Sequence, residues 1–415
     1  MKQYDAIIVG ARCGGAPLAM LLAKAGHQVL LVDRMAFGTD IMSTHYVKRS
    51  GASLLNQWGL LDAVRAVGTP AIEQLTFEID GTRLSGNAPP YEGVATDFTP
   101  RRFYLDKILV DAAIEAGAEV RDEFSVTDLL FDDGRVTGIK GAAKGGAEVS
   151  ERAKIVVGAD GVRSLVAKTV AAEHTIDAGT HTCGHYAYYS GMRESDSSAE
   201  LRILTDKRRF FITFPTNDEL DMVFLFWPAA EAKQVRANLD NAYAESLRLV
   251  PELEARVQAG TRETRISGTH LLPNFFRQAH GPGWALVGDA ALHRDPITAQ
   301  GITNAFTHAA ILAQELDSAL QGGSSLDSAT AAYDQRQFQL LKPMFDYTVH
   351  LAMLQALPEE MRQMLPMVAN DPSATTAFIG AFMGSVPLDK VFPPSLLDRF
   401  AADVERGQQE QRNVA

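Results

Sequence analysis

Residues 5–33 read DAIIVGARCGGAPLAMLLAKAGHQVLLVD, and this stretch decides the fold class. The apolar run at 5–9 is typical of a strand buried on both faces. A glycine-rich turn follows it, and then a helical pattern at 16–25 that Gly26 is placed to end. A second apolar run at 28–32 completes the order strand, tight turn, helix, strand. This order predicts the first βαβ unit of a Rossmann-like α/β domain.

The turn after the first strand has the chemistry of dinucleotide binding. Gly10 and Gly15 allow a backbone to approach a pyrophosphate, and the N-terminus of the following helix favours its negative charge. Asp33, which follows the second strand, is placed to accept hydrogen bonds from a ribose diol. The usual pattern is G-x-G-x-x-G, and Arg12 occupies the place of its middle glycine, where it adds positive charge near a phosphate. On this segment alone, a βαβ unit that binds no nucleotide remains an alternative.

Two further segments place an aspartate after a strand-like run. GADGVRS at 158–164 follows the run at 154–157, and GDAALHRDPITAQGITN at 288–304 follows the run at 284–287. In open α/β sheets, ligands bind at the carboxyl ends of the strands. Both aspartates are therefore expected at the edge of the sheet where the first motif also lies.

Together the three segments resemble the three FAD signatures of the class A flavoprotein monooxygenases, the para-hydroxybenzoate hydroxylase-like family. The resemblance covers roughly residues 1–350 and implies non-covalently bound FAD. Leu292 and Ala299 depart from the usual form of the third motif. These departures, with STH at 43–45 and WGL at 58–60, indicate a branch that also resembles geranylgeranyl reductase-type FAD oxidoreductases.

The resemblance assigns residues to parts of FAD. Asp289 would contact the ribityl chain, and Gly301 and Ile302 would open a helix whose amides face the flavin pyrimidine ring. Arg102 would lie near the pyrophosphate, with a surface basic pair near a helix start as the alternative, and the backbone of Val126 would contact adenine. The expected cofactor-binding residues are Gly10, Arg12, Cys13, Gly14, Gly15, Asp33, Arg34, His45, Arg102, Val126, Asp160, Gly161, Gly288, Asp289, Pro296, Gly301 and Ile302.

The segments between the motifs complete the predicted architecture. Residues 119–157, with turns at 132–134 and 144–146, indicate a three-stranded meander. We predict an α/β protein with a Rossmann-like FAD-binding fold of the glutathione reductase-2 type, a β-meander, a mixed-sheet substrate domain and a C-terminal helical segment. The expected domains are an FAD-binding domain at 1–71, 99–173 and 267–321, a substrate domain at 72–98 and 174–266, and a helical region at 322–415.

Alternating apolar residues at 199–203, 209–214 and 222–227 predict strands of the substrate domain, and a helical segment follows at 230–258. Aromatic side chains recur on these strands and would suit a flat apolar substrate. Packing within the core explains any one of them equally well. The expected substrate-binding residues are Tyr188, Phe211, Phe214 and Phe226.

Composition excludes several classes of function. The 415 residues include 39 basic and 51 acidic ones, a net charge of -12, which argues against nucleic acid as the main partner. Two cysteines, Cys13 and Cys183, cannot form a disulfide framework or a thiolate metal site. No apolar run reaches the length of a membrane span, and no signal-peptide pattern opens the chain. We therefore expect a cytoplasmic protein with no integral membrane association, and a homodimer is possible.

The resemblance also implies a reaction. In the family, NADH or NADPH reduces FAD, O2 adds at the flavin C4a, and the resulting hydroperoxide transfers one oxygen atom to an electron-rich substrate. The prediction is therefore an FAD-dependent monooxygenase that hydroxylates an aromatic or polycyclic small molecule of specialised metabolism. His45 lies in the segment expected near the isoalloxazine and is the candidate catalytic residue, because histidine titrates near neutral pH. A hydrogen-bonding role without catalysis remains open.

Three alternatives use the same fold. An FAD-dependent C=C reductase of the geranylgeranyl reductase type carries the same motifs, and substrate-dependent O2 consumption separates it from a monooxygenase. A non-catalytic binding or escort protein, such as a GDP-dissociation inhibitor, loses FAD-binding residues that this chain retains. A flavin halogenase carries W-x-W-x-I-P, whereas no two of Trp58, Trp227 and Trp284 are two residues apart.

Overall fold

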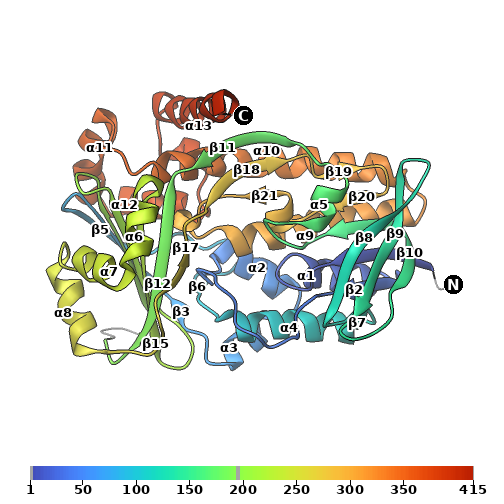
Figure 1. The fold of residues 1–415 in the computed structure, drawn as a ribbon. Helices are drawn as coiled ribbons and strands as arrows, with labels where there is room; N and C mark the ends of the chain where they lie inside the picture. The colour runs from blue at the N-terminus through green and yellow to red at the C-terminus, as the bar shows by residue number, and fades with distance from the viewer. Residues whose placement is uncertain (1–2, 193–196, 415) are drawn as a thin grey trace.

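The first sheet is built around β1, which has parallel neighbours on both sides in the computed structural model (Figure 1). The structure describes residues 3–192 and 197–414. The strand order is β19-β20-β10-β1-β2-β7, and the central strands are apolar and buried because helices cover the sheet. The strands are β1 (Gln3–Val9), β2 (Val29–Val32), β7 (Glu119–Arg121), β8 (Phe124–Asp132), β9 (Arg135–Ala143), β10 (Val149–Gly158), β19 (His280–Gly281) and β20 (Trp284–Leu286).

The predicted meander is confirmed as β8, β9 and the first half of β10. The first half of β10 pairs antiparallel with β9, and its second half runs parallel to β1 and β20. One strand thus ties the meander to the parallel sheet. The helices of this half are α1 (Gly15–Lys24), α2 (Arg49–Gln57), α3 (Leu61–Ala66), α4 (Arg102–Glu115), α5 (Leu165–Thr169) and α9 (Gly301–Leu320).

The second sheet is mixed, as predicted, in the order β16-β12-β15-β14-β13-β4-β5 with β17 against β12. Only β4 and β13 pair in parallel along this path, and they come from the two separate stretches 72–98 and 174–266. The strands are β4 (Gln74–Ile79), β5 (Thr82–Gly86), β12 (Thr182–Ser190), β13 (Ser198–Leu204), β14 (Arg209–Pro215), β15 (Leu220–Pro228), β16 (Thr261–Arg262) and β17 (Ser267–Thr269).

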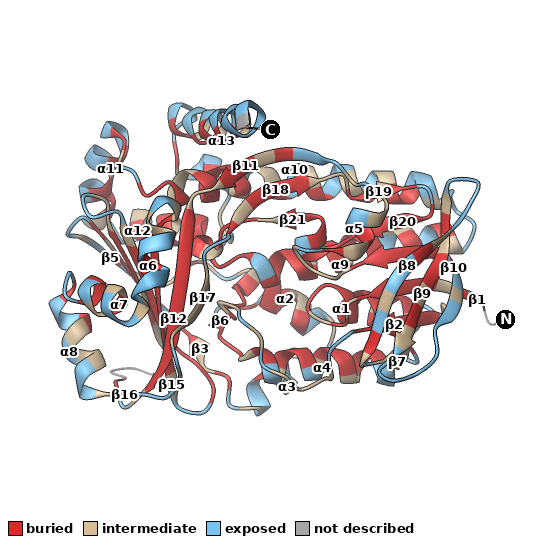
Figure 2. Cartoon of the chain, viewed as in Figure 1, coloured by how far each residue is buried: buried red, intermediate tan, exposed pale blue. Residues whose placement is uncertain are grey.

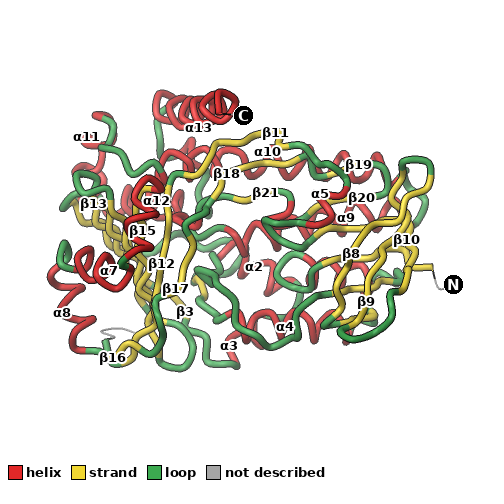
Figure 3. The backbone as a smooth tube through the Cα atoms, viewed as in Figure 1, coloured by secondary structure: helices red, strands yellow, loops and turns green. Residues whose placement is uncertain are grey.

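Two small sheets connect these halves. In Figure 3, β11 and β18 run side by side between the two large sheets, and β21 pairs with β18. The strand pair β3 and β6 lies where the chain leaves the first half. Their bounds are β3 (Ala71–Ile72), β6 (Asp97–Phe98), β11 (His174–Thr180), β18 (Pro273–Arg277) and β21 (Leu292–His293).

Each face of the second sheet has its own helical cover, so its strands are largely buried (Figure 2). The outer face packs under three helices, and the inner face packs against the C-terminal helices and the loop after β21. The outer helices are α6 (Ala232–Ala237), α7 (Leu239–Leu247) and α8 (Pro251–Ala259); the C-terminal ones are α10 (Leu326–Ala352), α11 (Glu359–Ala369), α12 (Pro372–Met383) and α13 (Pro394–Val414); single 3-10 turns are η1 (Ala229–Glu231), η2 (Gly288–Ala290), η3 (Pro296–Thr298) and η4 (Leu388–Lys390).

Helix α10 joins the two halves. Near its start, the Tyr333 hydroxyl donates to the carbonyl of Leu286 at the end of β20. Further along, the hydroxyls of Thr348 and Thr298 are hydrogen-bonded at 2.8 Å, and Tyr347 packs in the core under the second sheet. The candidate site lies between the halves that this helix connects.

Candidate active site

The glycine-rich turn after β1 packs directly on the second motif. A Cβ on Gly10, whose φ is +106°, would lie 2.4 Å from the Ala159 carbonyl oxygen, and a Cβ on Gly15 would lie 1.8 Å from the Gly10 oxygen. No side chain caps the N-terminus of α1, where Gly14 is the N-cap. The first amides of such a helix have no intrahelical acceptor and favour an anion.

Asp33 directly follows β2 beside this turn and is buried. Its Oδ2 accepts a hydrogen bond from the Ala11 amide at 2.9 Å, and its Oδ1 accepts one from the Met35 amide at 2.8 Å. Each carboxylate oxygen retains capacity for another donor. Asp33 is thus fixed at the position where dinucleotide folds hold a ribose, and Arg34 beside it is exposed.

Arg12 and Arg102 share one carboxylate, that of Asp106. Arg12 Nη1 donates to Asp106 Oδ2 at 2.7 Å, and Arg102 Nε donates to Asp106 Oδ1 at 2.9 Å. Burial lowers the pKa of Arg102, but its acidic neighbours, with Asp106 first among them and Asp289 of the third motif included, together outweigh burial, so the pKa is raised. Asp106 was not among the site residues expected from the sequence. Its i,i+4 spacing from Arg102 on a predicted helix is the signal that could have identified the pair.

Cys13 packs within this turn as a neutral thiol. Its Sγ lies 3.5 Å from Asp106 Oδ1. Burial raises the pKa of the Cys13 thiol far above its usual range. Cys13 therefore contributes small-residue packing and no charge to the turn.

Asp160 of the second motif serves its own loop. Its Oδ1 accepts from the Ser164 hydroxyl at 2.5 Å, and its Oδ2 accepts from the Leu165 amide at 2.7 Å, which together fix the start of α5. Burial raises the pKa of Asp160. Gly161 follows with a φ of +81°, and Val126 is half-buried on β8. The structure brings the loop of Asp160 against Gly10 but leaves Val126 on the meander.

The third motif forms the single 3-10 turn η3 before α9, and this turn ends at Ala299 in the left-handed conformation. Ala299 stands where the family pattern has glycine, and it adopts a φ of +49°, the conformation that glycine accommodates without strain. Asp295 caps the turn, accepting from the Ile297 amide at 3.0 Å and from the Thr182 hydroxyl. Burial raises the pKa of Asp295 to about 6. Pro296 is thereby held at the first position of η3.

The N-terminus of α9 begins at Gly301 and Ile302. Gln300 is the N-cap and makes no capping hydrogen bond with its side chain. A Cβ on Gly301 would meet no described atom within 4 Å. The amide of Gly288, at the start of the motif, donates to His308 Nδ1 at 2.9 Å. The start of this helix therefore leaves room beside Gly301 for a ligand.

His45 lies at the junction of the two halves. Its φ is +34° and its side chain is buried, and neither ring nitrogen has a hydrogen-bond partner. Its ring contacts Tyr188 at 5.7 Å and Phe214 at 5.4 Å between centroids. Burial, and then the charges of Arg102 and Arg101, lower the pKa of His45 to about 3. The expectation that it titrates near neutral pH is therefore wrong for this structure, in which the ring is neutral.

Three of the four expected substrate residues share the inner face of the second sheet. Tyr188, Phe214 and Phe226 lie in the core that includes the loop after β21 and the C-terminal helices. Phe211 was wrongly grouped with them: it points to the outer face and packs with Trp227 under α6–α8. The cause is the two-residue period of a strand, which separates Phe211 from Phe214 on β14.

The buried polar atoms at this junction fit a polar cofactor. Unpartnered donors or ring nitrogens occur on His45, Arg294, Gln300 and His308. An unsatisfied buried polar group costs about 1–3 kcal/mol, so native proteins rarely retain several without a ligand or water. FAD, which offers carbonyl and phosphate oxygens along its length, suits this set together with the two helix N-termini and the Arg12–Arg102 pair.

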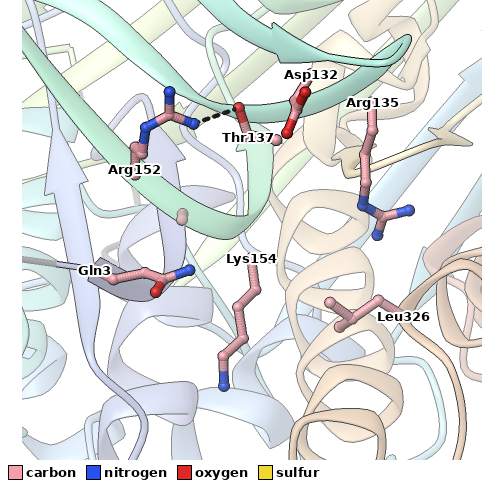
Figure 4. Close-up of a pocket in the computed structure, with 8 residues that line it drawn as sticks. Gln3, Asp132, Arg135, Thr137, Arg152, Lys154 and Leu326 are labelled. Atoms are coloured by element: carbon pink, nitrogen blue, oxygen red, sulfur yellow. Dashed lines mark hydrogen bonds between the residues drawn. The ribbon is translucent and has the colours of Figure 1, made fainter.

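A separate surface pocket of about 400 Å³ lies on the meander, near the start of α10 (Figure 4). Its cations have partners: Arg135 pairs with Asp327 at 2.8 Å, Lys154 pairs with Asp5 at 2.8 Å, and Arg152 donates to Thr137 at 3.2 Å. None of these residues belongs to the predicted motifs. The pocket is therefore not part of the candidate active site.

Neither a metal-binding cluster nor a membrane-spanning helix is found in the described ranges. In residues 3–192 and 197–414, no group of three or more His, Cys, Asp or Glu side chains could hold a metal ion. Across the same ranges, every helix is too short or too polar to cross a membrane.

Comparison with known proteins identifies the family. Residues 3–344 match the model of the FAD binding domain family, so the chain belongs to that family, and the prediction of an FAD-dependent oxidoreductase is confirmed. The digeranylgeranylglycerophospholipid reductase of Methanocella arvoryzae is 28% identical over 354 residues, which cover 83% of this chain and 85% of that protein. A second such reductase, from Methanopyrus kandleri, is 25% identical and covers 84% of this chain and 85% of that protein.

Solved structures share the fold at lower identity. The flavin-dependent brominase Bmp2 superposes with a TM-score of 0.83 at 18% identity, covering 98% of this chain and 100% of that one. PqsL of Pseudomonas aeruginosa, solved with 2-aminobenzoylacetate, gives a TM-score of 0.75 at 22% identity over 89% of this chain and 100% of that one. At these identities the likeness shows the fold, which is that of FAD-dependent halogenases and monooxygenases.

Proposed function

We propose that this chain is a cytoplasmic monooxygenase that uses NADH or NADPH and O2 to hydroxylate an aromatic or polycyclic small molecule. One observation carries the proposal. The inner face of the second sheet presents Tyr188 and Phe214 against His45, whose pKa of about 3 keeps it neutral, and Phe226 lies further along the same face, so the wall of the site is aromatic and uncharged. Such a wall suits a flat apolar substrate and excludes water, which protects reactive oxygen chemistry from hydrolysis.

The roles of the residues follow from their positions. When bound, FAD supplies the redox chemistry, accepting reducing equivalents from NAD(P)H and passing them to O2. The Arg12–Arg102 pair and the start of α1 would hold its pyrophosphate, and Asp33 would hold its ribose. Asp289 would contact the ribityl chain, while the first amides of α9 would face the flavin ring.

His45 would act by hydrogen bonding. A neutral imidazole has one N–H donor and one acceptor nitrogen, and both nitrogens of His45 are free to meet a polar group of a ligand. Because its pKa is about 3, His45 is the neutral imidazole at neutral pH and does not act as a general acid. It would orient a hydroxyl or carbonyl of the substrate against the aromatic wall.

A second candidate function has its own support. The chain is 28% identical to a digeranylgeranylglycerophospholipid reductase over 83% of its length. This supports a C=C reductase that uses the same site on an unsaturated apolar substrate. Reduction of an alkene requires a proton source, which neutral His45 does not supply at neutral pH. The monooxygenase is the first candidate because of the aromatic wall.

The test is NAD(P)H oxidation measured together with O2 uptake on purified protein whose visible flavin spectrum has been recorded. A monooxygenase consumes O2 in proportion to an aromatic substrate and forms an oxygenated product. Anaerobic reduction of an alkene without an oxygenated product establishes the reductase instead. A protein that neither retains nor takes up FAD contradicts both functions.

A matched pair of variants locates the substrate. Phe214→Leu on the inner face is expected to raise the KM for an active substrate, because it changes the wall beside His45. Phe211→Leu lies on the same strand but on the outer face, so it should leave the KM unchanged. Equal effects of the two variants would show that the inner face is not the substrate wall.

A further inference from the structure

Arg294 is a buried cation with no anion beside it. Its Nη2 donates to Asn304 Oδ1 at 2.7 Å, while its Nε and Nη1 have no partner. No carboxylate among the described residues forms an ion pair with it, and burial alone lowers the pKa of Arg294 to about 9. An uncompensated buried charge is strongly destabilising. A ligand that brings negative charge would remove this cost.

The groups around Arg294 add positive potential or donors. Lys48 is also buried, and its pKa is lowered first by burial and then by the charge of Arg294, so the two cations lie near each other. The Lys48 ammonium donates to the Phe382 carbonyl, not to a carboxylate. Helix α9 begins beside Arg294, and its N-terminus carries a partial positive charge.

One face of α9 presents unsatisfied donors. Gln300, Asn304 and His308 follow at intervals of four, so they share that face. His308 Nδ1 accepts from the Gly288 amide, and the pKa of His308 is lowered to about 3 by burial and then by Arg294. The single proton of the neutral ring therefore lies on Nε2. This N–H and the Gln300 Nε2 both lack acceptors.

Among the buried arginines of the described residues, Arg294 is distinctive in having no carboxylate partner: Arg49 pairs with Asp97, Arg102 with Asp106 and Arg202 with Glu200. Arg12 and Arg102 share Asp106, and Arg135 and Lys154 in the surface pocket pair with Asp327 and Asp5. The missing anion at Arg294 is thus a local feature of the α9 N-terminus. This end of the site is also where the flavin ring is expected.

We propose that Arg294 supplies the positive charge that stabilises the anionic reduced form of the FAD isoalloxazine. The inference rests on FAD binding as proposed above, and it applies equally to oxygen transfer and to alkene reduction. Reduced flavin carries its negative charge over the pyrimidine ring, which the first turn of α9 would face. Arg294, next to that turn, would favour the charge without touching the substrate, and it is therefore a positioning charge and not a catalytic acid.

The test measures charge at the flavin without any turnover. Sulfite adds to N5 of oxidised flavin and leaves a negative charge over the pyrimidine ring, so its dissociation constant reports positive charge there. Arg294→Gln and Arg294→Met remove the charge, Arg294→Lys keeps it, and Arg362→Gln on exposed α11 is the matched control. The two-electron midpoint potential of bound FAD is measured on the same proteins.

The neutral variants are expected to bind sulfite about tenfold more weakly or worse. Their midpoint potential is expected to fall by about 30 mV, the equivalent of tenfold for a two-electron couple. Arg294→Lys should stay within about threefold of the wild type, and Arg362→Gln should match it.

Sulfite affinity and potential that match the wild type in both neutral variants overturn the proposal. If neither neutral variant retains FAD, Arg294→Lys decides: wild-type sulfite affinity supports the proposal, and about tenfold weaker affinity overturns it. A wild-type protein that binds no FAD would instead refute the proposed function itself.

Discussion

The two ends of the candidate FAD site handle charge in opposite ways. At the phosphate end, Arg12 and Arg102 share the carboxylate of Asp106 within the chain. At the α9 end, Arg294 is buried without a counter-charge, and His45, at the junction of the two halves, is buried without a hydrogen bond. The cations at the phosphate end thus have a partner within the chain, whereas Arg294 and His45 carry polar atoms whose partners come from outside it.

This difference indicates that one end of the site provides binding energy for FAD and that the other end affects its chemistry. A prearranged, ion-paired pocket binds a pyrophosphate with little reorganisation. Unsatisfied groups at the other end lower the stability of the free protein. The protein regains that stability when a ligand supplies acceptors. We infer that the phosphate end gives FAD its affinity and that the α9 end sets the properties of the flavin ring.

The largest effect is expected from adding one carbon atom to the turn at the phosphate end. Gly15→Ala places a Cβ 1.8 Å from the Gly10 carbonyl oxygen, so the turn must open and the amides of α1 must move. FAD binding should weaken by more than about 100-fold, because several hydrogen bonds of about 1 kcal/mol each are lost together. The measurement is the ratio of flavin to protein absorbance after gel filtration.

Gly14→Ala is the adjacent control. Its Cβ would lie 3.3 Å from a Val287 methyl group, which can shift by a few tenths of an ångström. FAD should therefore be retained. Full flavin content in Gly15→Ala would show that the turn is not the phosphate site.

The second largest effect is expected from removing the charge of Asp106, the counter-charge within the chain. Asp106→Asn leaves Arg102 buried and unpaired, and breaking such a pair costs about 3 kcal/mol. FAD should recover much of this loss, because its phosphates can replace the carboxylate. Urea unfolding with and without FAD measures both quantities.

An exposed ion pair on the same helix serves as the control for Asp106. Asp111→Asn breaks the exposed pair with Lys107 on α4 and should cost less than about 1 kcal/mol. If FAD stabilised Asp106→Asn no more than it stabilises the wild type, the arginines would not be the pyrophosphate ligands.

The burial of His45 without a hydrogen-bond partner is tested by lowering the pH. The pKa of His45 is about 3 in the folded chain and about 6.5 in an unfolded one, so between these values the unfolded state binds more protons. The stability contributed by the neutral ring is therefore complete above pH 6.5 and is lost as the pH falls toward 3. From pH 7 to pH 5 the loss is about 2 kcal/mol. His45→Asn, whose side chain tolerates the positive φ of this residue, should lack this loss.

Urea unfolding of the FAD-free protein at both pH values measures the difference. His174→Asn, at an exposed histidine, is the control. Parallel pH curves for His45→Asn and the wild type would mean that His45 is not held neutral by burial.

The motifs of both ends were readable in the sequence because they are local. The turn at 10–15, the hairpins at 132–134 and 144–146, and the helix from Gly301 each depend on neighbouring residues, and each lies where the sequence predicted it. Ala299 shows the limit of motif matching. Its side chain departs from the pattern, but its φ of +49° preserves the turn that the pattern encodes.

The contacts that distinguish the two ends were not readable. Asp106 was visible as a neighbour of Arg102 on a helix, but its second partner, Arg12, lies 94 positions away. Lys48 donates to Phe382 across 334 positions. The isolation of Arg294 is a property of the whole interior, since it depends on every carboxylate lying elsewhere. The grouping of Phe211 with Phe214 was avoidable, because strand alternation alone places these two residues on opposite faces of the sheet.

The smallest expected effect sharpens the comparison at Arg12. Arg12→Gly restores the middle glycine of the dinucleotide pattern and removes a side chain that is 22% exposed. Arg102 keeps Asp106, so unfolding free energy should change by less than about 1 kcal/mol. FAD should dissociate about three- to tenfold faster, because one charge near the pyrophosphate is lost while the turn is preserved. Stopped-flow transfer of FAD to an excess of an apo-flavoprotein measures the rate. Slower dissociation would mean that Asp106 holds Arg12 away from the phosphates and that Arg102 alone binds them, so the phosphate end would be less complete than its ion pairs suggest.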